Sequence, residues 1–78
     1  MPDAELSTSS QIPIVRDPGI LAGRPVFRGT RVPIDVLFDN LADGLTVDEL
    51  LESYPSLSRP DVLAVLDLAR HRVLDTAA

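Results

Sequence analysis

The chain has no cysteine and no tryptophan, and its aromatic side chains are limited to two phenylalanines and one tyrosine. The absence of cysteine excludes disulfides and thiolate metal sites as a means of stabilising the fold. With so few aromatic residues, the core must be built from leucine, valine, isoleucine and alanine. At 78 residues such a core is only marginally sufficient, so we expect further stability from oligomerisation or a partner subunit.

Segments for membrane crossing or export are also missing from the sequence. No apolar run approaches the ~20 residues that a membrane-spanning helix needs. The N-terminal segment Met1–Leu6 is acidic and lacks the apolar stretch of a signal peptide. We therefore expect a cytoplasmic protein without a membrane partner.

The charge is distributed unevenly along the chain. Residues 12–34 carry four arginines against one aspartate, a net charge of +3, whereas residues 35–78 carry nine acids against three arginines. The net charge of −5 argues against strong, non-specific binding of nucleic acid, because affinity for phosphates scales with the cations presented. Three of the arginines lie within Gly23–Ile34, so a basic ribbon precedes an acidic remainder.

Composition and turn residues predict a leader followed by one domain. Residues 1–11 are predicted to be a disordered leader, because this serine-rich segment has nothing to bury. Residues 12–75 are predicted to form a single domain. It consists of a β-ribbon over residues 12–33 and three helices over residues 34–75.

The ribbon contains a predicted β-hairpin. Val26–Phe27 and Arg31–Val32 are short apolar segments separated by Arg28–Thr30, which is the pattern of two strands joined by a tight turn. Residues 12–15 predict a further short strand, which proline confines to the edge of a sheet or to its start. A hairpin of this length is not stable alone and needs support from outside.

Three helices are predicted from apolar residues spaced i, i+3, i+4 and i+7. The first ends at Gly44, the second follows a capping box of Thr46 with Glu49, and the third has Ser58 as its N-cap. The predicted core stripes are Ile34, Leu37, Phe38 and Leu41 in the first helix, Val47, Leu50, Leu51 and Tyr54 in the second, and Val62, Val65, Leu66, Ala69 and Val73 in the third.

The third predicted helix is apolar on nearly every side. Leu63, Ala64 and Leu68 lie off its stripe, so that only Asp67 is polar between Val62 and Ala69. A helix of this kind is buried on more than one side, and two short helices cannot cover it completely. We infer that a second chain covers it, either a symmetric copy or another protein. The predicted interface residues are Leu63, Leu68 and Val73.

The predicted fold class is mainly α with a short N-terminal β-hairpin, as a trihelical, helix-turn-helix-like (homeodomain-like) domain. Such units occur in DNA-binding proteins but also serve as plain packing solutions. The third helix is poorly suited to reading DNA. Two of the residues exposed near its N-terminus, Asp61 and Asp67, are acids, and only Arg59 could contact a guanine edge.

The ribbon arginines are better candidates for an anionic partner. Arg24, Arg28 and Arg31 could enter a DNA groove on a two-stranded ribbon or bind an anionic protein. Equally, they could pair with acidic helical faces of their own chain or of a sister chain. The sequence leaves both alternatives open.

The sequence contains no arrangement typical of an enzyme. Asp35, Asp39 and Asp43 line one face of the first helix, but a solvated face explains them better than a metal site does. The single histidine, His71, has no cysteine, serine or acid recognisably placed to complete a catalytic set. No nucleophile elbow, phosphate loop or zinc motif is present. We therefore expect no enzyme, no cofactor and no metal site.

The chain resembles the family called domain of unknown function 433, whose members are regarded as VapB-like antitoxins. The most specific part of the resemblance is Gly29-Thr30-Arg31-Val32-Pro33-Ile34, followed at a fixed distance by Tyr54-Pro55. Further matching residues are Ile14, Pro18, Ile20, Gly23, Pro25, Val26, Leu41, Gly44, Thr46, Glu49, Leu50, Leu51, Leu57, Asp61, Val62, Ala64 and Leu66. The resemblance covers roughly residues 12–69.

The resemblance implies a function in binding another protein. Its expected partner is a small toxin from a neighbouring gene, similar to PIN-domain ribonucleases, whose active site is a cluster of acids that holds Mg²⁺. An arginine inserted among these acids would compete with the metal ion. The candidates are Arg28 and Arg31 on the ribbon, and Arg70 and Arg72 near the C-terminus.

The sequence therefore predicts an antitoxin that neutralises such a toxin, acts as a homodimer or as a subunit of the complex, and binds operator DNA for autoregulation. The alternative is a stand-alone helix-turn-helix transcriptional regulator. A third possibility is a purely structural dimerisation module. The antitoxin hypothesis predicts an adjacent reading frame for the toxin, and the regulator hypothesis predicts salt-sensitive, specific DNA binding by the purified chain alone.

Overall fold

A computed structural model describes residues 12–76 of the chain. Over these residues the fold is mainly helical, with three α-helices and a short antiparallel strand pair near the N-terminus, as the sequence predicted. The elements are β1 (Ile14–Val15), a 3-10 turn η1 (Leu21–Gly23), β2 (Val26–Phe27), α2 (Ile34–Ala42), α3 (Val47–Ser53) and α4 (Arg59–Thr76). The predicted leader lies outside the described residues. None of the described helices is both long and apolar enough to cross a membrane.

The two-stranded sheet consists of β1 and β2, and the segment that follows the turn adds only an isolated bridge to it. Ile14 lies opposite Phe27 and Val15 opposite Val26. The predicted strand at residues 31–32 is therefore wrong, although the tight turn is present: the Thr30 amide donates to the Phe27 carbonyl at 3.1 Å. The returning chain pairs antiparallel with β2 at a single bridge, Val26 with Pro33, flanked by hydrogen bonds from the Phe27 amide to the Val32 carbonyl and from the Ile34 amide to the Pro25 carbonyl, each at 3.0 Å. The predicted hairpin is therefore present only as this short contact.

The helices begin and end where the local sequence predicts. Gly44, with φ of +95°, follows the end of α2 in a conformation that costs glycine little. At the start of α3, the Glu49 amide donates to Thr46 Oγ1 at 3.1 Å and the Thr46 amide donates to Glu49 Oε1 at 2.8 Å. The Asp61 amide donates to Ser58 Oγ at 3.3 Å, which places Ser58 at the start of α4. Local capping therefore fixes three of the boundaries.

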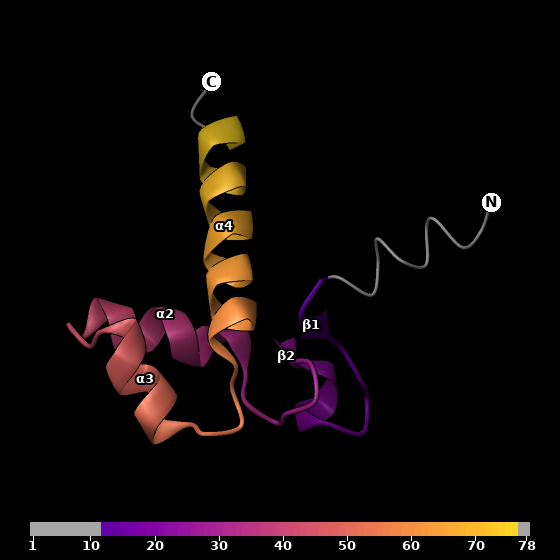
Figure 1. The fold of residues 1–78 in the computed structure, drawn as a ribbon. Helices are drawn as coiled ribbons and strands as arrows, with labels where there is room; N and C mark the ends of the chain where they lie inside the picture. Colours follow the sequence, from indigo (N-terminus) through magenta and orange to yellow (C-terminus); the bar gives the residue numbers. More distant parts are fainter. Residues whose placement is uncertain (1–11, 77–78) are drawn as a thin grey trace.

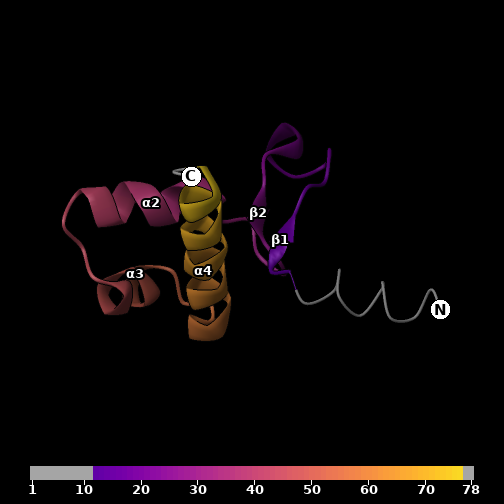
Figure 2. The same cartoon turned by 90° about the horizontal axis from the view of Figure 1, so that it is seen from above.

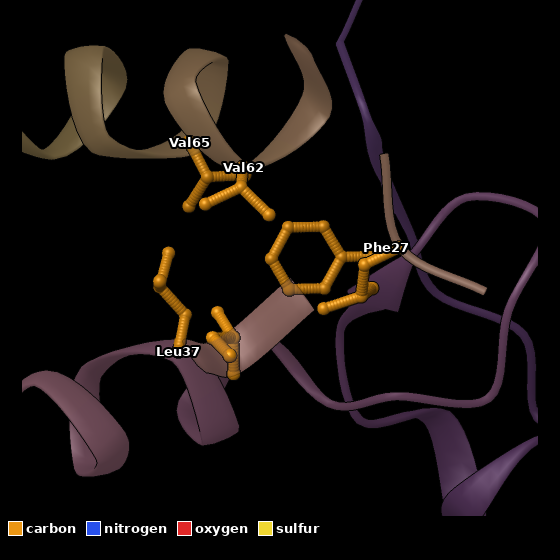
Figure 3. Packing of buried hydrophobic residues seen from close by; sticks show 6 residues of the cluster. Phe27, Leu37, Val62 and Val65 are labelled. Carbon is orange, nitrogen blue, oxygen red and sulfur yellow. The ribbon is translucent and has the colours of Figure 1, made fainter. Parts of the chain in front are cut away.

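The core lies where the first turns of α4 meet the strand pair, α2 and α3. In both views α4 lies between the α2–α3 pair on one side and the strands on the other (Figures 1 and 2). Figure 3 shows the ring of Phe27 extending from β2 toward Val62, while Leu37 extends from α2 toward α4. The buried cluster consists of Phe27, Leu37, Leu50, Leu57, Val62 and Val65.

Two residues of the predicted core stripes are exposed. Phe38 is 39% exposed, because the buried face of α2 is centred on Leu37 and leaves the phenylalanine at its margin. Val73 is 65% exposed, because α2, α3 and the strands cover only the first turns of α4. The remaining turns project beyond the rest of the molecule (Figure 1). We call residues 66–76 of α4 the arm.

The connection between the two strands contains three consecutive residues in the left-handed region. The φ angles of Leu21, Ala22 and Gly23 are 50°, 57° and 85°. The turn is closed by the Gly23 amide donating to the Ile20 carbonyl at 3.0 Å. Left-handed backbone brings Cβ close to the following carbonyl oxygen and costs roughly 1–2 kcal/mol for a residue other than glycine. The turn is therefore strained at Leu21 and Ala22.

We expect Ala22→Gly to raise the free energy of unfolding by about 1 kcal/mol, because glycine relieves the left-handed strain that alanine suffers there. Ala64→Gly, in the middle of α4, is the matched control and should lower it by about 1 kcal/mol. Urea denaturation followed by circular dichroism measures both changes. A loss of stability in both variants would contradict the left-handed turn.

Candidate functional site

The Gly29–Arg31 segment forms a loop that its own first two residues hold in place. Gly29 has φ of +73°, which few other residues adopt without strain. Thr30 Oγ1 donates to the Phe27 carbonyl at 2.8 Å and accepts from the Val32 amide at 3.0 Å. Both residues therefore have a clear structural role, and their hydrogen bonds are internal to the loop. We call residues 28–32 the signature loop.

Arg31 is an exposed residue of the signature loop. Among residues 12–76, no carboxylate lies within the 4.0 Å limit of an ion pair with its guanidinium group. Its backbone position is nevertheless fixed, because the Val32 amide donates to Thr30 Oγ1 across it and Thr30 Oγ1 in turn donates to the Phe27 carbonyl. The loop therefore presents a positive charge that the described part of the chain does not neutralise.

The other two ribbon arginines pair with acids on the helices. Arg24 Nη2 lies 2.8 Å from Asp35 Oδ2 at the start of α2. Arg28 makes a two-pronged contact with Asp61 at the start of α4, with Nη2 at 3.1 Å from Oδ1 and Nε at 3.3 Å from Oδ2. The Asp61 side chain is only 17% exposed, so this pair is better shielded from water than the Arg24 pair. Of the two alternatives that the sequence left open, the structure shows pairing within the chain for both Arg24 and Arg28.

The base-reading candidate of the third helix is also paired. The guanidinium group of Arg59 contacts the Asp48 carboxylate and so connects the start of α4 to the first turn of α3. Both side chains are exposed, and a pair of this kind contributes roughly 0–1 kcal/mol to stability. Any contact of Arg59 with a base would require this pair to open.

The predicted interface residues lie along the exposed sides of α4. Leu63 is 48% exposed, Leu68 is 41% exposed and Val73, on the arm, is the most exposed of the three. Arg70 contacts Asp67 one turn earlier at 3.3 Å, whereas Arg72 has no carboxylate partner among residues 12–76. An uncovered apolar surface with arginines beside it is thus present where the sequence predicted an interface.

Acidic side chains do not converge anywhere in the described part of the chain. Asp35, Asp39 and Asp43 follow one another along α2, and Asp35 is engaged by Arg24. Over residues 12–76 no group of three acidic or histidine side chains is placed to hold a metal ion. His71 Nδ1 lies 2.9 Å from the Asp67 carbonyl oxygen within its own helix.

Sequence reasoning missed two features that position the signature loop. The Arg28–Asp61 pair joins residues 33 positions apart, and no local pattern marks which of nine downstream acids an arginine will contact. The pairing of β2 with β1 was missed because the turn residues favoured the shorter hairpin. The available signal was the presence of two short apolar pairs, Ile14–Val15 and Val26–Phe27, that can lie opposite each other.

The fold and these surfaces define a small, mainly helical domain with a basic ribbon loop and a projecting helix. Residues 14–69 match the family described as Protein of unknown function (DUF433), and the chain belongs to that family. This confirms the family resemblance read from the sequence.

Two similar proteins support the assignment. "Uncharacterized protein y4eO" from Sinorhizobium fredii (strain NBRC 101917 / NGR234) is 42% identical over 53 residues, which are 68% of this chain and 24% of that protein. The chain thus spans about a quarter of that relative's length. The crystal structure of a DUF433 member protein from Anabaena variabilis ATCC 29413 matches with a TM-score of 0.71 and 27% identity, over 94% of this chain and 72% of that one.

Proposed function

We propose that this protein is an antitoxin-type binding protein that neutralises a PIN-like ribonuclease toxin by docking on it. Family membership does not by itself carry the proposal, since the family is described as one of unknown function. The observation that carries it is Arg31, an exposed arginine without a carboxylate partner among residues 12–76, on a loop fixed by Gly29 and Thr30. The class of toxin follows from the family resemblance.

The chemistry of the proposal depends on the shape of the guanidinium group. Arginine stays charged at neutral pH and presents its N–H donors in a planar fork that matches a carboxylate. Placed among the acids of a metal-dependent ribonuclease, this fork occupies the oxygen atoms that Mg²⁺ requires. Because the signature loop is already held by internal hydrogen bonds, docking Arg31 orders little additional backbone.

The test uses the full chain together with the product of the adjacent reading frame. We expect Arg31→Glu to restore RNA cleavage by that product and to weaken the complex by at least about a hundredfold, since a charge is reversed inside an acidic site. Arg31→Lys should have an intermediate effect, because lysine keeps the charge but loses the fork. Cleavage and affinity are measured on the same preparations.

A matched control separates this role from the general effect of charge. Arg16→Glu makes the same change at an exposed arginine that follows β1 and has no carboxylate partner among residues 12–76. It should leave neutralisation intact. If Arg72→Glu restores cleavage and Arg31→Glu does not, the masking arginine lies on the arm and the role given to Arg31 is wrong. Failure of the two proteins to form a complex would overturn the antitoxin function itself.

The alternative function, a stand-alone DNA-binding regulator, has less support. Its base-reading candidate Arg59 is engaged by Asp48, and Asp61 and Asp67 place negative charge on the same helix. Binding of operator DNA by the complex of antitoxin and toxin stays a prediction. Salt-sensitive, specific binding of DNA by the purified chain would favour the regulator.

A further inference from the structure

The arm of α4 carries an apolar stripe with an arginine on either side. Val62 and Val65 are buried against the core, and the same helical face continues through Leu66, Ala69 and Val73. At 100° per residue, Arg70 and Arg72 fall on opposite sides of this stripe. Exposure rises along the face, and the arm projects away from the chain's own α2 (Figure 1). Residues 12–76 therefore leave this stripe uncovered.

The outer side of α2 carries the complementary pattern. Phe38 and Ala42 are one turn apart and exposed, and Asp39 and Asp43 form an exposed acidic row beside them. Unlike Asp35, these two acids have no cationic partner among residues 12–76. One surface of the chain is thus apolar and basic, and another is apolar and acidic.

We propose that two copies of the chain form a symmetric dimer in which the arm of each copy lies across α2 of the other. The apolar stripe of the arm packs against Phe38 and Ala42, while Arg70 and Arg72 face Asp39 and Asp43 of the second copy. A twofold axis repeats this contact, so that the arm and α2 of both copies are occupied. The assembly therefore closes as a dimer, because neither of these two surfaces stays available for a third copy. Charge complementarity selects a second copy as the occupant, since each copy offers both surfaces.

The proposed dimer does not require neutralisation of a toxin. The signature loop with Arg31 is not part of either surface. A dimer could therefore form in a protein that binds no toxin, and a toxin could be neutralised by a monomer. The experiment below uses the chain alone, so that its outcome is independent of the partner.

The test is a charge exchange between the two surfaces. Variant one carries Arg70→Glu with Arg72→Glu, and variant two carries Asp39→Arg with Asp43→Arg. In sedimentation equilibrium, each variant alone should dimerise about a hundredfold more weakly than the wild type, because like charges now face each other at both contacts. Mixed in equal amounts, they should form a heterodimer with affinity within about tenfold of the wild type, since opposite charges then meet again at both contacts.

The controls exclude an effect of net charge alone. Variant two brings the chain closer to neutrality, so a general reduction in repulsion would strengthen association, in contrast to the expected weakening. Glu52→Arg on α3 and Arg16→Glu lie outside both surfaces and should leave the dimerisation constant within about twofold. Raising the salt concentration should weaken the wild-type dimer, because exposed ion pairs are screened.

Several results would overturn the proposal. A wild-type chain that stays monomeric at all concentrations would contradict the dimer. This holds even if the arm is found to bind a different protein. If variant one weakens the dimer and variant two does not, the arm meets some surface other than α2. A mixture that fails to form the heterodimer would contradict the exchange of charges. Recovery in the mixture, by contrast, also demonstrates that both variants are folded.

Discussion

Phe27→Ala is expected to lower the free energy of unfolding by about 3–5 kcal/mol. Phe27 is 1% exposed, is the only aromatic residue of the buried cluster and joins the strand pair to α4 (Figure 3). Its truncation leaves a cavity that the surrounding side chains fill only partially. Since small domains are stable by only about 5–15 kcal/mol, we expect a substantial unfolded population in this variant.

Phe38→Ala is the matched control for this experiment. Phe38 is the same residue type in the same chain, but it lies at the margin of the buried face of α2 and is 39% exposed. Its replacement should cost only about 1–2 kcal/mol in dilute protein, where association does not contribute, because the side chain is partly exposed. Urea denaturation monitored by circular dichroism measures both. Equal losses in the two variants would mean that the two phenylalanines are similarly buried.

Leu37→Ala is expected to destabilise the domain by about 2–5 kcal/mol. The side chain is fully buried and extends from α2 toward the first turns of α4, where Val62 and Val65 lie (Figure 3). Its truncation leaves a cavity between the two helices. Thermal and urea denaturation should both report the loss.

The control for Leu37 is Leu74→Ala on the arm. Leu74 is also a helical leucine, but it is 57% exposed. In dilute protein its truncation should change the free energy of unfolding by less than about 0.5 kcal/mol, because little apolar contact is lost. A cost as large as that of Leu37 would show that the arm is packed within the monomer, contrary to its position beyond the core.

The helices could be predicted from the sequence because the information that specifies them is local. Thr46 and Glu49, three residues apart, cap the start of α3. Gly44 follows the end of α2 with a positive φ angle that glycine adopts readily. The same holds for the buried residues nearest the middle of each stripe, such as Leu37 and Leu50. Spacing along a helix identifies which side chains share a face.

Spacing does not determine how much of that face is covered. Phe38 and Val73 fit their stripes as well as the buried residues do, yet the other elements leave Phe38 39% and Val73 65% exposed. Coverage depends on the length and placement of neighbouring helices, which no local pattern encodes. In the candidate site, the sequence singled out the signature loop and its arginines. It could not separate Arg28, which pairs with Asp61, from Arg31, which lacks such a partner among residues 12–76.

The contacts of the ribbon with α4 have a consequence for recognition. The signature loop follows directly from Phe27, which packs on Val62, and its first residue, Arg28, is held by Asp61 at the start of the same helix. A two-stranded ribbon of this length has no independent stability, so the loop keeps its shape only while the first turns of α4 are folded. A partner that binds Arg31 therefore recognises a conformational epitope and not a linear motif. Peptides covering residues 23–34 should accordingly be poor competitors of the intact domain.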